Sequence, residues 1–140
     1  MHARAWVLLL FCLLCSSCKP APFKRLPLVA ADGTLTNDGK PLTGVVVRFY
    51  FPKPPFTEEG RGATNSKGEF TVTHKSGDPG LLPGLYRITV HRRVMPGGRV
   101  VQDLTQGAEE MPQFLTDPAT SGLEVKIDKG GAFELKLTGI

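Results

Sequence analysis

The 140-residue chain has room for one small domain, and its 41% hydrophobic and 21% charged residues are typical of a globular rather than a disordered protein. Its formal net charge is only +4. The basic residues are scattered, except for a group formed by His91, Arg92 and Arg93 with Arg87 and Arg99 nearby. No aromatic residues are interleaved with this group, and the mild charge and the lack of aromatic residues both argue against nucleic-acid binding. Sixteen glycines and twelve prolines indicate many turns between short strands and few helices.

The start of the chain carries the pattern of an export signal. After Arg4, residues 6–14 form an unbroken apolar run that is too short to cross a membrane but is typical of a signal-peptide core. Ser16-Ser17-Cys18, which follows Leu14, resembles the lipobox of bacterial lipoproteins, where the chain is cut before a lipid-bearing Cys. The resemblance implies a signal peptide over residues 1–17 and lipid attachment at Cys18.

Cys15 is the alternative lipid acceptor. It stands where such boxes usually have Leu, three residues before Cys18. Cleavage before Cys15 would place Leu14 in a position that favours small residues, so we predict Cys18 as the acceptor. Lys19 follows Cys18, whereas retention in the inner membrane is associated with Asp at that position. The resemblance therefore implies an outer-membrane or cell-surface location.

Cys12, Cys15 and Cys18 also have the C-x-x-C-x-x-C spacing of some metal sites. We do not interpret them as metal ligands, because they lie in a segment that is expected to be removed or to carry a lipid. Residues 19–140 contain no Cys, so a domain in this part of the chain depends on its apolar core rather than on disulfides.

Residues 18–28 are predicted to be a tether. Three prolines within residues 19–27 favour an extended, unpaired chain. At about 3.1 Å per residue, such a chain would hold the domain roughly 25–30 Å from the lipid anchor. We therefore expect one folded domain over residues 29–140.

Beyond the tether, apolar and polar residues alternate with the period of β-strands. Alternation predicts strands at residues 45–51, 69–73, 86–91, 123–128 and 133–137, with two more at 31–36 and 61–64. Asn and Gly at residues 37–42 and 65–68 predict tight turns. Each strand is expected to bury one face, so we predict an all-β, two-layer antiparallel sandwich of about seven strands.

The two tyrosines of the predicted sandwich receive structural roles. Tyr86 falls on the inward face, where a Tyr after a Pro-Gly turn commonly ties its hydroxyl to a neighbouring backbone group. Tyr50 falls on the outward face or under an edge. Trp6 is the only Trp and belongs to the signal segment, so the domain lacks the aromatic platform typical of carbohydrate-binding sandwiches.

Three stretches in order resemble the carboxypeptidase regulatory-like domain: TNDGKPLTGVVVRF at 36–49, ATNSKGEFTV at 63–72 and PGLYRITV at 83–90. DPATSGLEV at 117–125, with the closing strand at 133–137, resembles the bacterial lipoprotein branch of that family. The resemblance covers most of residues 30–140. It implies a transthyretin-like (prealbumin-like) Greek key, usually noncatalytic and often an accessory or adhesive module.

The connection between Val94 and Ser121 is longer than the structureless loops usually found in compact domains. We expect a short strand or turn within it at residues 100–104. Long loops disproportionately carry function, which makes this connection the first candidate for a binding surface; the alternative is a plain surface loop.

The residues supply little for catalysis. His74 and His91 are the only histidines after the signal segment, neither has a second His at metal-ligand spacing, and no H-E-x-x-H motif occurs. His74, Ser76 and Asp78 are interpreted as a polar turn rather than a catalytic triad, because adjacent loop residues seldom converge as a triad does. We predict no catalytic residues, no cofactor and no metal ligands.

Together these patterns predict a noncatalytic, exported and lipid-anchored cell-envelope protein. Its partners would be the membrane, through the anchor, and another envelope protein, through the sandwich. The alternative is a protein that binds a small ligand or glycan in a cleft under the connection between Val94 and Ser121. A hydrolase is the third hypothesis, and the sparse reactive side chains favour it least.

Overall fold

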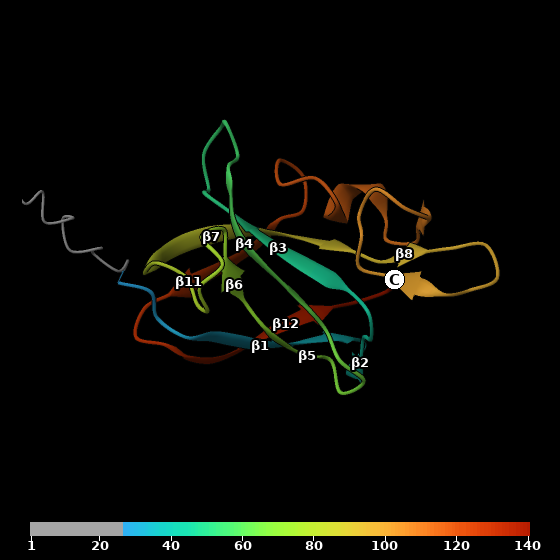
Figure 1. Ribbon diagram of the computed structural model, residues 1–140, viewed down its shortest axis with the longest axis horizontal. Helices are drawn as coiled ribbons and strands as arrows, with labels where there is room; N and C mark the ends of the chain where they lie inside the picture. Colours follow the sequence, from blue (N-terminus) through green and yellow to red (C-terminus); the bar gives the residue numbers. More distant parts are fainter. Residues whose placement is uncertain (1–26) are drawn as a thin grey trace, which may run out of the picture.

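Two facing β-sheets enclose the core of the computed structural model, which describes residues 27–140 (Figure 1). The larger sheet has the strand order β11-β7-β3-β4-β6. Its strands are β3 (Val46–Tyr50), β4 (Glu58–Ala63), β6 (Thr73–His74), β7 (Gly84–His91) and β11 (Leu123–Ile127). All its pairings are antiparallel, and one β-bulge lies between Phe49 and Tyr50.

The second sheet contains β12 (Gly131–Leu137), β1 (Ala31–Asn37), β2 (Lys40–Pro41) and β5 (Glu69–Thr71). β1 lies in its centre and pairs with the other three strands. Its pairing with β12 is parallel, from Ala31 opposite Gly131 to Asn37 opposite Leu137. The prediction of a wholly antiparallel sandwich is therefore wrong at this one pair. The all-β class and the sandwich are confirmed, and the transthyretin-like Greek key stays a prediction.

A third, small sheet and a short helix form between β7 and β11. β8 (Arg93–Val94) lies between β9 (Val100–Val101) and β10 (Ala108–Glu109), and the 3-10 helix η1 (Gln113–Leu115) follows. We call residues 92–121 the capping segment. The strand predicted near residue 100 is present as β9, and β8, β10 and η1 add three further short elements to the segment.

The predicted strand at residues 69–73 is divided between the two sheets. β5 pairs with β1 in one sheet, and β6 pairs with β4 in the other. Val72 lies between them, fully buried, and its N–H donates to the Ala31 carbonyl at 2.9 Å. The chain thus crosses from sheet to sheet here and closes one side of the sandwich.

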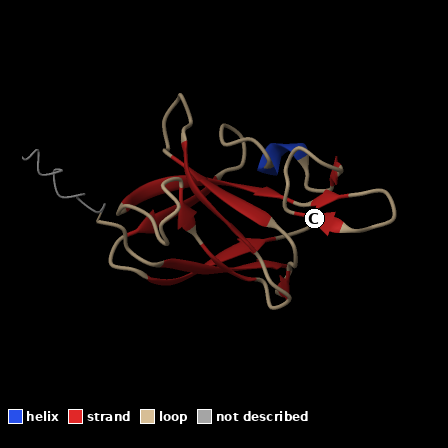
Figure 2. Cartoon of the chain, in the orientation of Figure 1, coloured by secondary structure: helices blue, strands red, loops and turns tan. Residues whose placement is uncertain are grey.

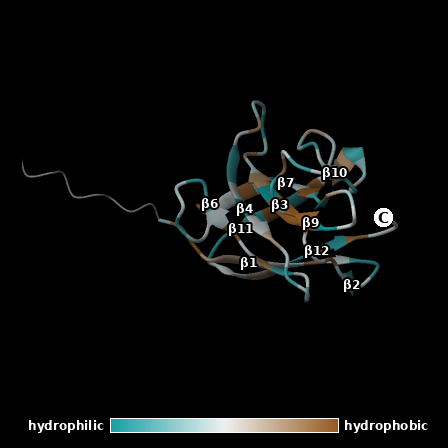
Figure 3. Cartoon of the chain, turned by 45° about the vertical axis from the view of Figure 1, so that its right-hand side comes forward, coloured by the Kyte–Doolittle hydropathy of each residue, from teal (hydrophilic) through white to brown (hydrophobic). Residues whose placement is uncertain are grey.

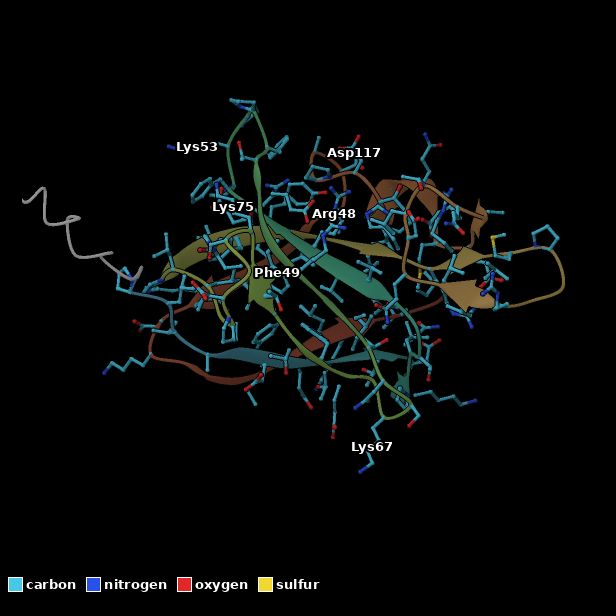
Figure 4. The ribbon with its side chains drawn as sticks, in the orientation of Figure 1. Arg48, Phe49, Lys53, Lys67, Lys75 and Asp117 are labelled. Atoms are coloured by element: carbon cyan, nitrogen blue, oxygen red, sulfur yellow. The ribbon has the colours of Figure 1, made fainter. Side chains whose placement is uncertain are left out.

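Aromatic side chains fill the centre of the core. Phe49 is fully buried, and its ring centroid lies 6.3 Å from those of Phe70 and Tyr86 and 6.0 Å from that of Phe133. Figure 4 places Phe49 between the two sheets, and Figure 3 shows hydrophobic residues gathered in the central strands. The inward faces predicted from alternation for β3 and β7 are confirmed.

The predicted turns are also confirmed. Asp38 and Gly39 have positive φ angles of 50° and 79°, which suit the two-residue turn between β1 and β2. The Asn65 side-chain oxygen accepts hydrogen bonds from the backbone N–H groups of Lys67 and Glu69. The Tyr86 hydroxyl donates to the Leu82 carbonyl at 2.6 Å, as predicted.

The outward face of β3 and β7 differs from the prediction. Val46, Tyr50, Thr89 and His91 are all at most 8% exposed, although each lies on the face expected to meet solvent. The capping segment accounts for much of this burial, since Glu109 contacts His91 and the buried side chains of Met111 and Leu115 extend the core. These two strands therefore bury much of their outward face as well as their inward face.

Candidate functional site

The sandwich has two contrasting ends. Residue 27 enters at one end, whereas β2, β8 and the C-terminal residues lie at the other (Figure 1). The capping segment, with its short helix, lies toward that second end (Figure 2). The register of the larger sheet places the end of β7 and the start of β3 side by side, because His91, the last residue of β7, pairs with Val46. The candidate site is built at this distal end.

A line of hydrogen bonds connects the outward face of β7 to the capping segment. Thr89 Oγ1 lies 3.0 Å from His91 Nε2, and His91 Nδ1 lies 3.2 Å from Glu109 Oε2. A carboxylate oxygen accepts, so the geometry assigns the proton of the neutral ring to Nδ1 and leaves Nε2 to accept from the Thr89 hydroxyl. Alternation places His91 on the outward face of β7, the face expected to meet solvent, yet the residue is only 8% exposed.

Glu109 joins the last residue of β7 to two positions of the capping segment. Besides contacting His91, its Oε1 accepts hydrogen bonds from the backbone N–H groups of Arg92 at 2.8 Å and Met111 at 3.0 Å. Glu109 has no role in the strand pattern of the sequence, where its one signal is an acidic side chain within a long connection. The carboxylate fixes the path of the chain into the cleft described next.

The distal cleft has a volume of about 470 Å³. Residues of the capping segment form one wall, and residues that follow the β1–β2 turn form the other. Its lining includes Pro41, Leu42, Arg92, Glu110, Met111 and Pro112. An apolar surface with a few fixed polar groups is the usual composition of a small-molecule site or of the centre of a protein interface.

Arg92 spans the two walls of the distal cleft. Its guanidinium pairs with the Glu110 carboxylate, and its Nε donates to the Thr43 carbonyl at 3.1 Å. Beside it, Gly44 has a φ of +70°, and a Cβ there would lie 2.6 Å from Val100 Cγ1. The β9 turn is thus seated directly on the backbone before β3, and a side chain at Gly44 would displace it.

A second charged group covers the middle of the outward face. Glu58 pairs with Arg48 and Arg61, and the Arg48 guanidinium lies 5.2 Å from the centre of the Tyr50 ring. Burial opposes ionisation of Glu58, but hydrogen bonds from the two arginines outweigh it and lower its pKa. Burial raises the pKa of Tyr50. The group holds β3 and β4 together and contains no free nucleophile.

The predicted polar turn at His74, Ser76 and Asp78 lies at the opposite end. His74 Nδ1 is 2.8 Å from Ser76 Oγ, which lies 3.4 Å from Asp78. The polar turn is confirmed: Asp78 contacts Ser76 and does not lie behind His74 as the acid of a triad would. Glu59, to which no sequence motif points, is 2% exposed and lies 3.7 Å from His74 Nε2.

This turn is poorly arranged for nucleophilic catalysis. The N–H of Ser76 itself donates to His74 Nδ1 at 3.1 Å, so the nitrogen that faces the hydroxyl already accepts a hydrogen bond. Lys75 Nζ lies 2.8 Å from Glu59 and neutralises the carboxylate. His74 therefore lacks both a free lone pair toward Ser76 and an uncompensated acid behind it.

Other predicted features lie partly outside the described residues. The structure describes residues 27–140. Outside this range lie Cys18, Cys15, the signal segment at 1–17 and most of the tether at 18–28. Within residues 27–140, no helix has the length and apolar character to cross a membrane. Within the same residues, no three His, Cys, Asp or Glu side chains are grouped as a metal site would require.

No family model matches the chain, and no curated protein matches its sequence. A 9R-lipoxygenase from Cyanothece PCC8801 is a solved structure that does match, with 16% identity and a TM-score of 0.40. The match covers 80% of this chain and 16% of the lipoxygenase chain. Nothing about the activity of this chain follows from a similarity at that level.

Burial of His91 gives the site a pH dependence. Desolvation lowers the His91 pKa below its ordinary value of 6.5, against the opposing effect of Glu109. The folded protein then binds fewer protons than the unfolded chain, so the contribution of His91 to stability is complete above pH 6.5 and is lost as the pH falls through the folded-state pKa.

We expect the urea midpoint of the wild type, relative to that of His91→Gln, to decrease as the pH falls below 6.5. Other titrating groups are common to both proteins and cancel in the comparison. A difference that is constant with pH, or that grows in acid, would contradict the assignment of a buried neutral His91.

Proposed function

We propose that this chain is a noncatalytic cell-envelope protein, held at the outer membrane or cell surface by a lipid on Cys18. Its β-sandwich would present the distal cleft and the capping segment to another envelope protein. The resemblance to carboxypeptidase regulatory-like domains, which often serve as accessory modules, agrees with this proposal.

One observation carries the proposal: the described chain begins at one end of the sandwich (Figure 1), and the residues that line the distal cleft lie at the other. A tether that enters at residue 27 leaves the cleft on the side away from the anchor. The cleft therefore faces outward, where a protein partner has access to it.

The noncatalytic part of the proposal is supported by the arrangement of the reactive side chains. Hydrolysis needs a nucleophile, a base and donors for the developing charge, all directed at one point. His91 is engaged by Thr89 and Glu109, and the His74 turn lies at the far end from the distal cleft. Neither histidine lines the cleft.

A second candidate function is binding of a small ligand or glycan in the distal cleft. It is favoured by the combination of apolar side chains with the Arg92–Glu110 pair in a concavity of about 470 Å³. Such a ligand would place its apolar part against Leu42 and Met111 and its polar groups near Arg92.

Both parts of the main proposal can be tested in intact envelopes. Cells fed labelled palmitate should label the wild type and Cys15→Ala but not Cys18→Ala. In the labelled protein, a photo-crosslinking phenylalanine analogue in place of Phe114, which is 54% exposed in the capping segment, should yield one dominant protein adduct. The matched control carries the same analogue at Phe133, on the core side of β12.

The outcomes separate the candidates. Label that survives Cys18→Ala would contradict anchoring at that residue. A labelled protein whose Phe114 position gives the same adducts as the Phe133 control would contradict the distal interaction surface. If position 114 were crosslinked to a small molecule and not to a protein, the result would favour ligand binding over the protein-interaction proposal.

A further inference from the structure

The end of the sandwich where the chain enters has a surface of its own. We call it the entry pole and define it by residues 27–30, 51–57, 75–84 and 128–130. Its segments are adjacent because Val29 and Leu81 exchange backbone hydrogen bonds of 2.8 and 3.0 Å, while Gly84 pairs with Ile127. Figure 1 shows residues 75–84 and 128–130 beside the entering chain, while loop 51–57 projects away from the body of the sandwich.

The entry pole exposes large apolar side chains. Phe51 is 43% exposed, and Leu85, which directly follows the pole, is 45% exposed; the other two large exposed hydrophobic residues of the described chain, Phe114 and Ile140, lie elsewhere. The Phe51 ring stacks on Tyr86 with an interplanar angle of 14°, so its exposed edge is held in one orientation. The pole is thus a fixed apolar surface.

Loop 51–57 adds rigidity and positive charge to this surface. Its sequence is FPKPPFT, and the three prolines restrict its backbone. Lys53 is exposed on this projecting loop (Figure 4). At the base of the loop, Phe56 lies 6.0 Å from the Arg87 guanidinium. A cation beside exposed aromatic and aliphatic side chains is the combination that favours a lipid headgroup layer.

The segment before the entry pole carries the same sign of charge. Residues 18–27 include Lys19, Lys24 and Arg25 and no acidic residue. Basic residues near an anionic lipid surface each contribute about 1 kcal/mol of attraction. The charge on the tether and the apolar side chains on the entry pole thus both favour contact with an anionic lipid surface.

We propose that the entry pole rests on a phosphate-bearing membrane surface, with Phe51 and Leu85 in the headgroup layer and Lys53 at the lipid phosphates. This rests on the proposed lipid anchor, because one anchored chain keeps the pole within tether length of the bilayer. The contact fixes the orientation of the sandwich and holds the distal cleft away from the membrane.

The test uses the full chain in intact cells. A photo-crosslinking phenylalanine analogue replaces Phe51 in one variant and Phe114 in its matched control, since both side chains are aromatic and about half exposed. After irradiation, mass spectrometry counts lipid adducts on each protein. We expect the lipid-adduct yield at position 51 to exceed that at 114 by about tenfold, the ratio that corresponds to transfer of one half-exposed aromatic side chain.

A third variant with the analogue at Leu85 reports on the same surface if the change at Phe51 disturbs folding. Equal lipid yields at all three positions, or protein adducts alone at positions 51 and 85, would overturn the proposal. Palmitate labelling of the same samples separates the two hypotheses. Labelled protein without lipid adducts at the pole contradicts only the membrane contact, whereas unlabelled protein contradicts the anchor on which it rests.

Discussion

Replacing Phe49 with Ala is expected to lower the free energy of unfolding by about 3–5 kcal/mol, the usual cost of removing a fully buried aromatic side chain. Phe49 contacts three other aromatic rings from both sheets, so the cavity would open in the centre of the core. Surrounding strands cannot close it without moving the sheets together. Chemical denaturation monitored by circular dichroism measures the loss.

The matched control is Phe114→Ala, because Phe114 is 54% exposed on η1. Substitutions at such surface positions usually change stability by less than about 0.5 kcal/mol. Equal denaturation midpoints for the two variants would contradict the position of Phe49 in the centre of the core.

Replacing Glu109 with Ala is expected to release the capping segment while the sandwich stays folded. The change leaves the N–H groups of Arg92 and Met111 and the Nδ1 of His91 without their acceptor. Buried groups that lose a partner cost about 1–3 kcal/mol each, and part of that cost returns as water enters. We expect faster hydrogen exchange in residues 92–111 and faster proteolysis at Arg99, which lies in an exposed turn.

Two neighbouring substitutions sharpen this experiment. Glu110→Ala removes a pair in which the carboxylate side chain is 47% exposed, so its cost should stay within about 1 kcal/mol. Glu109→Gln keeps an oxygen that accepts from both backbone N–H groups, and it should preserve most of the protection. Equal exchange rates in Glu109→Ala and Glu110→Ala would show that Glu109 does not hold the segment.

Alternation predicted the inward side of the sandwich well. Val47 and Phe49 on β3, and Tyr86, Ile88 and Val90 on β7, are fully buried or nearly so. In each of these strands, every second residue is apolar and the period of two decides which face is inward. The turn that follows Asn37 and the one at Asn65 were predictable because Asn and Gly serve defined backbone geometries there.

The outward face could not be predicted in the same way. Thr89 and His91 are polar, and polarity in an alternating strand normally indicates solvent. His91 is covered by Glu109, which contacts it from 18 residues further along the chain, and Thr89 lies behind His91 within hydrogen-bond distance of its ring. Strands of two residues, such as β8 and β10, are too short for any periodic pattern. The candidate site was therefore predictable as a region and not as a set of residues.

The parallel pairing of β1 with β12 was also beyond local pattern. β1 pairs with residues 131–137. The alternation in each strand predicts which face is buried, but it does not predict which strand pairs with which or whether the pair is parallel. The division of residues 69–74 between two sheets had the same cause, because Val72 continues the period of two across the point where the chain leaves one sheet for the other.

That parallel pair also governs when the domain can close. β1 lies in the middle of its sheet, yet the hydrogen-bonding groups on one of its edges remain unpaired until β12 is in place. Leu135 and Leu137 of β12 join the core at the same step. Contacts between segments so distant in sequence form late and slowly. The sandwich therefore closes only after β12 has joined β1, and the strands that form earlier lack their last core side chains until then.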